Sequence, residues 1–360
     1  MRQKTLILKA LGLTLILLLL SGCGGPQSSP TPTSIPTLTP IPPTPTRVIP
    51  GIKPVVVDTD MAVDDWMAIL YLLQRTDVAI KAITVTGTGE AHCGPGIRNA
   101  LGLVALAGND PIPVACGRET PLEGEHTFPQ GWRERVDNLA GLSVPEGQNP
   151  AAGTTAVELL VSTIQSSPEK VTLLTLGPLT NVAELLLGTP SVSENIERVF
   201  IMGGAVHVTG NLSSNVANNQ AAEWNIYVDP HATNVVFEAG VPITLVPLDA
   251  TNQALLTMDF YEQVQSKRAT PEAKFVFDVL NKQMGFLKSG SWYFWDPLAA
   301  AVLTNESLAT YEQDALCVVE EEGPQSGQTQ VVTGCPEIRV AIFVDKVQFE
   351  QVFLDTLNNP

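Results

Sequence analysis

The sequence predicts an α/β fold: an open, mostly parallel sheet with helices on both faces, followed by a C-terminal hairpin. Apolar runs of strand length alternate with segments of helical periodicity along most of the chain. Several of the strand-like runs end in glycines or acids, which is typical of parallel strands that end at a ligand site. No linker-like stretch interrupts residues 51–360, which we therefore interpret as one domain.

The first expected strand, Val55–Val57, leads into the acidic segment Asp58-Thr59-Asp60-Met61-Ala62-Val63-Asp64-Asp65, which precedes a helix ending near Leu73. Four carboxylates in one turn repel each other unless a cation neutralises them or some remain protonated. Helix capping by Asp60 or Asp64 would explain one or two of these acids, but not all four. The segment therefore indicates a metal site or a catalytic site.

Strands and helices alternate after this segment. Further strands are expected at Ile80–Val85, Ile112–Ala115, Val171–Leu176, Val199–Met202, Ile243–Val246 and Arg339–Phe343. Further helices are expected at Ile97–Leu106, at Thr154–Ile164, after Gly177-Pro178, in a region reaching Leu287, from Asp296-Pro297, and around Val347–Leu357. Because ligands bind beyond the carboxyl ends of parallel strands, the chain after Val57, Val85, Leu176 and Met202 should converge on one site.

The segment from Gly117 to Pro150 carries no clear periodicity and is expected to be a loop. It contains His126, Phe128 and Trp132. A loop of this length with aromatic residues is either a lid over a binding site or a segment that its aromatics pin to the surface.

Two polar positions lie further along the chain. Glu223 and Asn225 are two residues apart, so on an extended segment they would project to the same face and suit the hydroxyls of a sugar. A solvated loop would use the same residue types. Asp296 stands among four aromatics, where an unpaired carboxylate is costly, so it either caps its helix or binds a metal; the two roles are compatible.

The N-terminal 50 residues indicate export. Residues 1–22 have basic residues, a short apolar run and small residues, as a signal peptide does. The ending Leu20-Ser21-Gly22-Cys23 resembles a bacterial lipobox, which implies lipidation of Cys23 and anchoring to the outer face of the cell membrane. An ordinary signal peptide with a chance cysteine is the alternative. Residues 23–50, rich in Pro, Thr and Ser, are expected to be an extended linker.

The net charge and the cysteines indicate which partners and which cross-links to expect. The formal net charge of −17 argues against a nucleic-acid polymer as partner but does not exclude a nucleoside. Cys317 and Cys335 flank a turn-rich stretch and are expected to pair across a hairpin, which leaves Cys93 to pair with Cys116. The cysteine spacings do not match a zinc site.

Together these motifs resemble the inosine-uridine preferring nucleoside hydrolase family across essentially all of residues 54–358. The matching motifs are the acidic segment 58–65, Ala82–Gly87, Leu176-Gly177-Pro178-Leu179-Thr180-Asn181, Met202-Gly203-Gly204, Glu223-Trp224-Asn225-Ile226, Asp229-Pro230 and Asp296-Pro297. The resemblance implies hydrolysis of an N-ribosyl bond of a nucleoside for salvage, and a homodimer or homotetramer.

The resemblance also implies roles for individual residues. One Ca²⁺ would be bound by Asp60, Asp65, the carbonyl of Leu176 and Asp296, and Asp60 would act as the base for an attacking water. The residues that match the binders of the ribose hydroxyls are Asp64, Asn211, Glu223 and Asn225.

Two positions depart from the family pattern. Trp295 stands where many members have a histidine thought to protonate the leaving base, and Gly87-Thr88 replaces a Gly-Asn pair, so that Thr88 takes the place of a substrate-binding residue. We hypothesise that Trp295, with Trp132 or His126, stacks on the base, which would favour purines.

Two other functions fit part of the pattern. A phosphatase of the haloacid-dehalogenase type would use Asp58 as its nucleophile, but would leave Asp64 and Asp65 unexplained. A lipid-anchored nucleoside-binding protein without hydrolase activity would retain the fold but not the chemistry.

Overall fold

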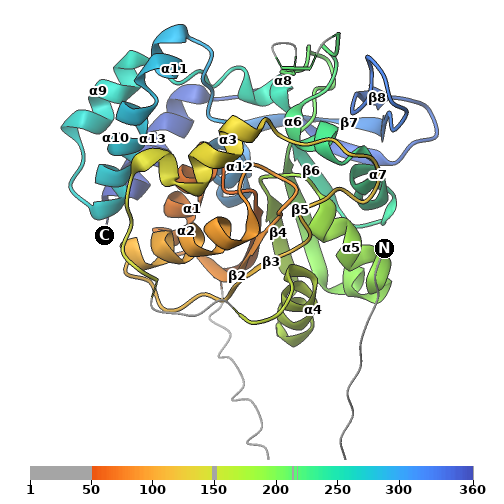
Figure 1. Cartoon of the computed structure of the whole chain (residues 1–360), viewed down its shortest axis with the longest axis horizontal. Helices are drawn as coiled ribbons and strands as arrows, with labels where there is room; N and C mark the ends of the chain where they lie inside the picture. The colour runs from red at the N-terminus through yellow and green to blue at the C-terminus, as the bar shows by residue number, and fades with distance from the viewer. Residues whose placement is uncertain (1–50, 148–151, 213–214, 217, 360) are drawn as a thin grey trace, which may run out of the picture. The chain divides into compact units, whose positions relative to one another are not determined.

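The computed structural model describes residues 51–147, 152–212, 215–216 and 218–359 (Figure 1). The expected signal peptide, Cys23 and the linker 23–50 lie outside the described residues. Within the described ranges, the structure has no helix that is both long enough and apolar enough to cross a membrane.

One nine-stranded sheet organises the described part of the chain, in the order β3-β2-β1-β4-β5-β6-β9-β7-β8. The strands are β1 (Lys53–Thr59), β2 (Val78–Val85), β3 (Val114–Cys116), β4 (Val171–Thr175), β5 (Ile196–Met202), β6 (Ile243–Val246), β7 (Ala309–Val318), β8 (Thr329–Val331) and β9 (Glu337–Val344). The strands from β3 to β9 in this order pair in parallel, whereas β7 is antiparallel to β9 and β8 to β7. The predicted open, mostly parallel sheet with a C-terminal hairpin is confirmed.

The strand order changes direction at β1. The chain moves outward from β1 to β2 and β3, then returns to place β4 on the other side of β1, where Asp58 is in register with Thr175. In open α/β sheets, ligands bind beyond the carboxyl ends of the strands at such a switch point. The expected convergence of the strand ends is therefore confirmed for β2, β1, β4 and β5, which are adjacent.

Helices cover both faces of the sheet (Figure 1). The side chains of Val55 and Val57 pack on one face and that of Val56 on the other, because successive residues of a strand point to opposite sides. The first face is covered by α1 (Val63–Leu73), α2 (Cys93–Leu106), α9 (Met258–Ser266), α10 (Pro271–Lys282), α12 (Trp295–Thr304) and α13 (Lys346–Asn358). The second face is covered by α4 (Ala156–Ser166), α5 (Thr180–Gly188) and α7 (Pro230–Glu238).

Shorter helices lie in the connections. They are α3 (Gln130–Asp137), α6 (Trp224–Val228), α8 (Leu248–Thr251), α11 (Met284–Ser289) and the 3-10 segments η1 (Leu139–Gly141), η2 (Pro190–Asn195) and η3 (Glu306–Leu308). The prediction of a loop from Gly117 to Pro150 is wrong in part, because α3 and η1 form within it. Only Arg133 and Val136 of α3 are buried, so the helix leaves almost no apolar period in the sequence.

Both expected disulfides are formed in the structure. Cys317 of β7 is bonded to Cys335, which lies just before β9, so this bond closes the hairpin region. Cys93 at the start of α2 is bonded to Cys116 at the end of β3.

Candidate active site

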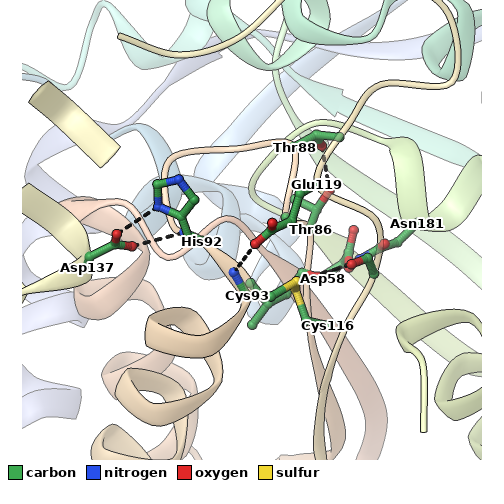
Figure 2. The surroundings of a disulfide bond; sticks show 12 residues. Asp58, Thr86, Thr88, His92, Cys93, Cys116, Glu119, Asp137 and Asn181 are labelled. Carbon is green, nitrogen blue, oxygen red and sulfur yellow. Dashed lines mark hydrogen bonds and ion pairs between the residues drawn. A yellow bond between two sulfur atoms is a disulfide. The ribbon is translucent and has the colours of Figure 1, made fainter. Parts of the chain in front are cut away.

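Asp58 is a structural residue of β1 and not part of the acidic turn. Its Oδ1 accepts hydrogen bonds from the Thr84 hydroxyl (2.6 Å) and the Asn181 side-chain amide (2.7 Å), so it links β1 to β2 and α5 (Figure 2). Burial raises the pKa of Asp58 to about 7. The expectation that four carboxylates share one turn is therefore wrong for Asp58, which lies within β1 and is 1% exposed. A carboxylate buried in this way is poorly placed to attack a phosphate ester.

Asp60 is buried where the chain leaves β1. Its carboxylate accepts hydrogen bonds from two backbone N–H groups, Ala62 to Oδ1 (3.2 Å) and Glu90 to Oδ2 (3.1 Å). Burial, and next the negative charge of Asp65, raise the pKa of Asp60 well above its ordinary value. With its pKa raised in this way, the carboxylate is a stronger base than an ordinary aspartate, which suits a general base.

Asp64, Asp65 and Asp296 form the acidic cluster of this site. One carboxylate oxygen from each lies within 4.8 Å of the others. Asp64 and Asp65 are in the first turn of α1, and Asp296 is in the first turn of α12. The family resemblance assigned Asp60 to the ion together with Asp65 and Asp296, whereas this geometry groups Asp64 with them and places Asp60 beside Asp65.

Helix capping does not explain the cluster. The N-cap residues of α1 and α12 are Ala62 and Phe294, and neither makes a side-chain capping bond. The alternative interpretation that Asp60 or Asp64 caps the first helix is therefore wrong, and so is the capping role that was considered for Asp296 beside metal binding.

The electrostatics of the cluster fit a bound divalent cation. Burial raises the pKa values of Asp64 and Asp65 to about 7, and burial with the nearby charges of Asp64 and Asp65 raises that of Asp296 well above its ordinary value. The Thr59 hydroxyl donates to Oδ1 of Asp65, but Oδ2 of Asp65 is buried without a hydrogen-bond partner among the described residues. Crowded carboxylates with an unsatisfied oxygen are the environment that a hard cation with oxygen ligands stabilises.

The chain after β4 forms the next part of the site. A Cβ on Gly177 would lie 2.6 Å from the Cβ of Asp60, so only glycine lets the two strand ends approach this closely. The Asn225 side-chain amide donates to the carbonyl oxygens of Leu176 (3.1 Å) and Met202 (3.2 Å). Asn225 thus connects the ends of β4 and β5 next to Asp60.

Glu223 is the N-cap of α6, not part of an extended segment as the sequence predicted. Its carboxylate accepts hydrogen bonds from three backbone N–H groups, those of Gly204 (3.0 Å), Asn225 (3.0 Å) and Ile226 (3.3 Å). The same helix start holds Asn211, whose side-chain oxygen accepts the N–H of the first residue of α6 (3.2 Å). All three expected sugar binders from this region therefore surround one helix terminus.

The loop between β2 and α2 completes the site. Thr88 is buried, and its hydroxyl lies 3.0 Å from those of Thr86 and Thr180. Glu90 was not expected from the sequence. Its N–H donates to Oδ2 of Asp60 (3.1 Å), and burial with the charges of Asp60 and Asp64 raises the pKa of its carboxyl group well above the ordinary value. The only sequence signal for Glu90 is that it follows Gly87 and Gly89 at a strand end.

The Cys93–Cys116 disulfide lies where this loop enters α2 (Figure 2). The N–H of Cys93 donates to Glu119 (2.7 Å), and the His92 ring lies 2.7 Å from the Asp137 carboxylate (Figure 2). The C-terminal end of the loop is thereby held to β3 and to α3.

Three aromatic residues were expected near the leaving base. His126 is engaged elsewhere: its ring stacks on Tyr227 (3.9 Å between centroids) and its nitrogens contact the Tyr227 carbonyl (2.7 Å) and Glu322 (3.1 Å). Trp132 of α3 is 36% exposed. Trp295 is partly buried next to Asp296, and its indole N–H has no hydrogen-bond partner among the described residues. The Trp295 ring lies near those of Phe286 (6.2 Å between centroids) and Tyr293 (5.9 Å). The Trp132 ring lies 5.3 Å from that of Trp224, the first residue of α6.

Known proteins are similar to this chain in sequence and in architecture. Residues 55–351 match the family model of the inosine-uridine preferring nucleoside hydrolases. The pyrimidine-specific ribonucleoside hydrolase RihA of Shewanella sp. (strain ANA-3) is 33% identical over 316 residues, which cover 85% of this chain and 96% of that protein.

Two solved structures are similar to this one. The inosine-uridine preferring nucleoside hydrolase of Bacillus anthracis superposes with a TM-score of 0.75 at 27% identity, covering 86% of this chain and 100% of the other. The purine-preferring ribonucleoside hydrolase of Gardnerella vaginalis gives a TM-score of 0.71 at 26% identity, covering 85% and 98%. With its acidic cluster at the switch point of the sheet and a family match over most of its length, the chain belongs to the inosine-uridine preferring nucleoside hydrolases and is an N-ribohydrolase.

Proposed function

We propose that this chain is a calcium-dependent enzyme that cleaves the N-glycosidic bond of ribonucleosides to ribose and a free base, for nucleoside salvage outside the cytoplasmic membrane. The observation that carries the proposal is the approach of the Asp64, Asp65 and Asp296 carboxylates to within 4.8 Å beside the buried Asp60. The donors are all oxygens, which favours calcium over metals that select nitrogen or sulfur ligands.

The residues of the site divide into those that hold the ion and one that moves a proton. Asp65, Asp296 and the Leu176 carbonyl would hold it, with Asp60 or Asp64 completing the carboxylate set. Bound there, calcium would supply positive charge that makes a water molecule more acidic and fixes its position. Asp60, with its raised pKa, would accept the proton of the water that attacks the anomeric carbon.

The polar residues around the start of α6 would bind the sugar. Asn225 and Asn211 are placed by backbone contacts, and Glu223 is fixed by three backbone N–H groups, so none of them must be ordered when the substrate binds. Hydrogen bonds that strengthen as the ribose flattens towards an oxocarbenium-like transition state would accelerate cleavage.

The base preference is a separate question. The relatives named above differ in the base that they prefer, since one is named as pyrimidine-specific and another as purine-preferring. Trp295 directly precedes Asp296 in α12, and its buried indole N–H has no hydrogen-bond partner among the described residues. On that ground we propose that the indole contacts the base and that purines are preferred.

The location outside the membrane is supported by the lipobox-like sequence that ends in Cys23 and by the linker that follows it. Labelled palmitate should be incorporated into the wild-type protein in a bacterial host and should not be incorporated into Cys23→Ser. Equal labelling of both proteins would contradict lipidation at this residue.

Activity is tested by incubating the purified protein with inosine, guanosine, adenosine, uridine and cytidine, with calcium or with a chelator, and assaying free ribose. We expect release that chelator abolishes and calcium restores. Nucleoside binding without release would instead indicate a binding protein. Light scattering on the same preparation tests the expected homodimer or homotetramer.

A further inference from the structure

Glu90 is held at the acidic cluster by the backbone of its own loop. A Cβ on Gly89 would lie 2.0 Å from the Cβ of Asp60, so the loop can approach Asp60 only with glycine at this position. The N–H of Glu90 then donates to the Asp60 carboxylate (3.1 Å), and the N–H of Ala91 donates to the Asp60 carbonyl (2.9 Å). These consecutive hydrogen bonds fix the position of Glu90 relative to Asp60.

The Glu90 carboxylate has no protein partner in the described part of the chain, although it is partly buried and close to the charges of Asp60 and Asp64. The two arginines of α3 whose charges act on Glu90 donate to other groups: Arg133 to the Gly87 carbonyl (3.0 Å) and Arg135 to Gln283 (2.5 Å). Partly buried carboxylates usually have hydrogen-bond donors, so the Glu90 carboxylate is open to a donor from water or from a bound ligand.

The side chain of Thr88, two residues earlier, differs from that of Glu90 because it has hydrogen-bond partners within the protein. It is buried, and its hydroxyl lies 3.0 Å from those of Thr86 and Thr180, so two of its three hydrogen-bonding positions are occupied inside the protein. The polar side chains of this loop are those of Thr86, Thr88, Glu90 and His92, and among the described residues Glu90 is the one whose side chain has no hydrogen-bond partner.

We propose that Glu90 is a specificity-determining residue that accepts a hydrogen bond from a ribose hydroxyl of the bound nucleoside. This inference rests on the proposed function of the site. A sugar hydroxyl is a donor that a carboxylate can accept, whereas a phosphate on the sugar would be repelled by Glu90 together with Asp60 and Asp64. The residue thus selects nucleosides with a free ribose over nucleotides.

The test compares Glu90→Gln with the wild type on uridine and inosine, and uses their 2′-deoxy and 3′-deoxy analogues as competitive inhibitors. Glu197→Gln is the matched control, because it removes an exposed carboxylate near the N-terminal end of β5, the end of the strand opposite to the site. We expect Glu90→Gln to lower kcat/KM for the ribonucleoside by about 10- to 100-fold. The inhibition constant of the analogue that lacks the contacted hydroxyl should change by less than about 3-fold, because the interaction is already absent.

Two results would overturn the assignment. Suppose that Glu90→Gln lowers kcat/KM for the ribonucleoside and weakens inhibition by both deoxy analogues by the same factor. That result would show that Glu90 contacts no hydroxyl. A calcium affinity that falls as much in Glu90→Gln as in Asp65→Asn would show that Glu90 is a metal ligand. If the wild type cleaves no nucleoside, the proposed function fails by itself, and Glu90 is judged from calorimetric binding of ribose, 2-deoxyribose and 3-deoxyribose to both proteins.

Discussion

The side-chain amide of Asn225 donates a hydrogen bond to the carbonyl oxygen of Leu176 (3.1 Å), so a residue of α6 orients a proposed ligand at the end of β4. Loss of this bond in Asn225→Ala should free the carbonyl to rotate, and groups that orient metal ligands typically contribute 10- to 100-fold to affinity. We expect calorimetry to show calcium affinity weakened by about 10-fold. Asn234→Ala is the control, since Asn234 makes equivalent bonds to the backbone of Val318 away from the site. Unchanged calcium binding in Asn225→Ala would contradict the role of Leu176.

The stability of the metal-free protein should fall as pH rises. Asp64 and Asp65 have pKa values of about 7 in the folded chain against 3.8 ordinarily, so between these values the folded chain binds more protons than the unfolded one. Unfolding free energy therefore decreases from about pH 4 to pH 7. In chelator, Tm should be at least about 5 °C higher at pH 5 than at pH 7.5.

Added calcium should reduce or reverse the difference in Tm between pH 5 and pH 7.5, because the cation stabilises the ionised carboxylates at neutral pH. A Tm difference that is the same with calcium and with chelator would mean that the cluster does not bind the ion.

Substitution of Asp60 should lower kcat far more than substitution of Asp58, although the two residues are only two positions apart. Asp60→Asn removes the base and should lower kcat by about 100- to 10,000-fold. Asp58→Asn keeps an acceptor oxygen for Thr84 and Asn181, so kcat should stay within about 10-fold while Tm decreases. Comparable losses of kcat in the two variants would place Asp58 in the chemistry.

The two disulfides should have separable effects. Replacing both cysteines of either bond by serine should destabilise the protein by about 2–4 kcal/mol, because each bond closes a loop in the unfolded chain. Cys93Ser/Cys116Ser should also lower kcat/KM, since that bond anchors the loop of Glu90, whereas Cys317Ser/Cys335Ser should lose stability alone. Denaturant unfolding together with steady-state kinetics distinguishes the two effects, and equal kinetic losses would argue against the anchoring role.

Trp295→Ala tests how the base leaves. If the indole stacks on the base and eases its protonation, cleavage of purine nucleosides should slow far more than cleavage of p-nitrophenyl riboside, which has an activated leaving group. We expect the ratio of kcat/KM for the purine nucleoside to kcat/KM for p-nitrophenyl riboside to fall by about 10-fold or more. Equal losses on both substrates would mean that Trp295 is a packing residue.

The sequence predicts the sheet and the acidic site because both depend on local patterns. Buried parallel strands are continuous apolar runs, and the rule that ligands bind at their carboxyl ends was sufficient to bring Asp60 and the chain after Leu176 together. Asn225 was assigned to the site by the family resemblance, and its amide does contact the Leu176 carbonyl.

The remaining features depend on contacts between distant segments. Glu90 reaches the cluster only because Gly89 lets the loop approach Asp60, and no periodicity encodes that approach. Glu223 caps a helix of five residues, too short for a helical pattern to be recognised. Asp58 was grouped with the other acids because adjacency in sequence does not show that its carboxylate is bonded to Asn181.

The pairing of β1 with β4 has a consequence for how the protein folds. Val55 pairs with Thr172, and the acidic cluster needs Asp296 of α12 as well as α1, so the site does not exist until segments from most of the chain have docked. Contacts this distant in sequence slow folding, because the intervening chain must be ordered before they form. A cation held by the whole proposed site therefore could not template an early intermediate. It would bind the assembled molecule, and would slow unfolding without accelerating folding.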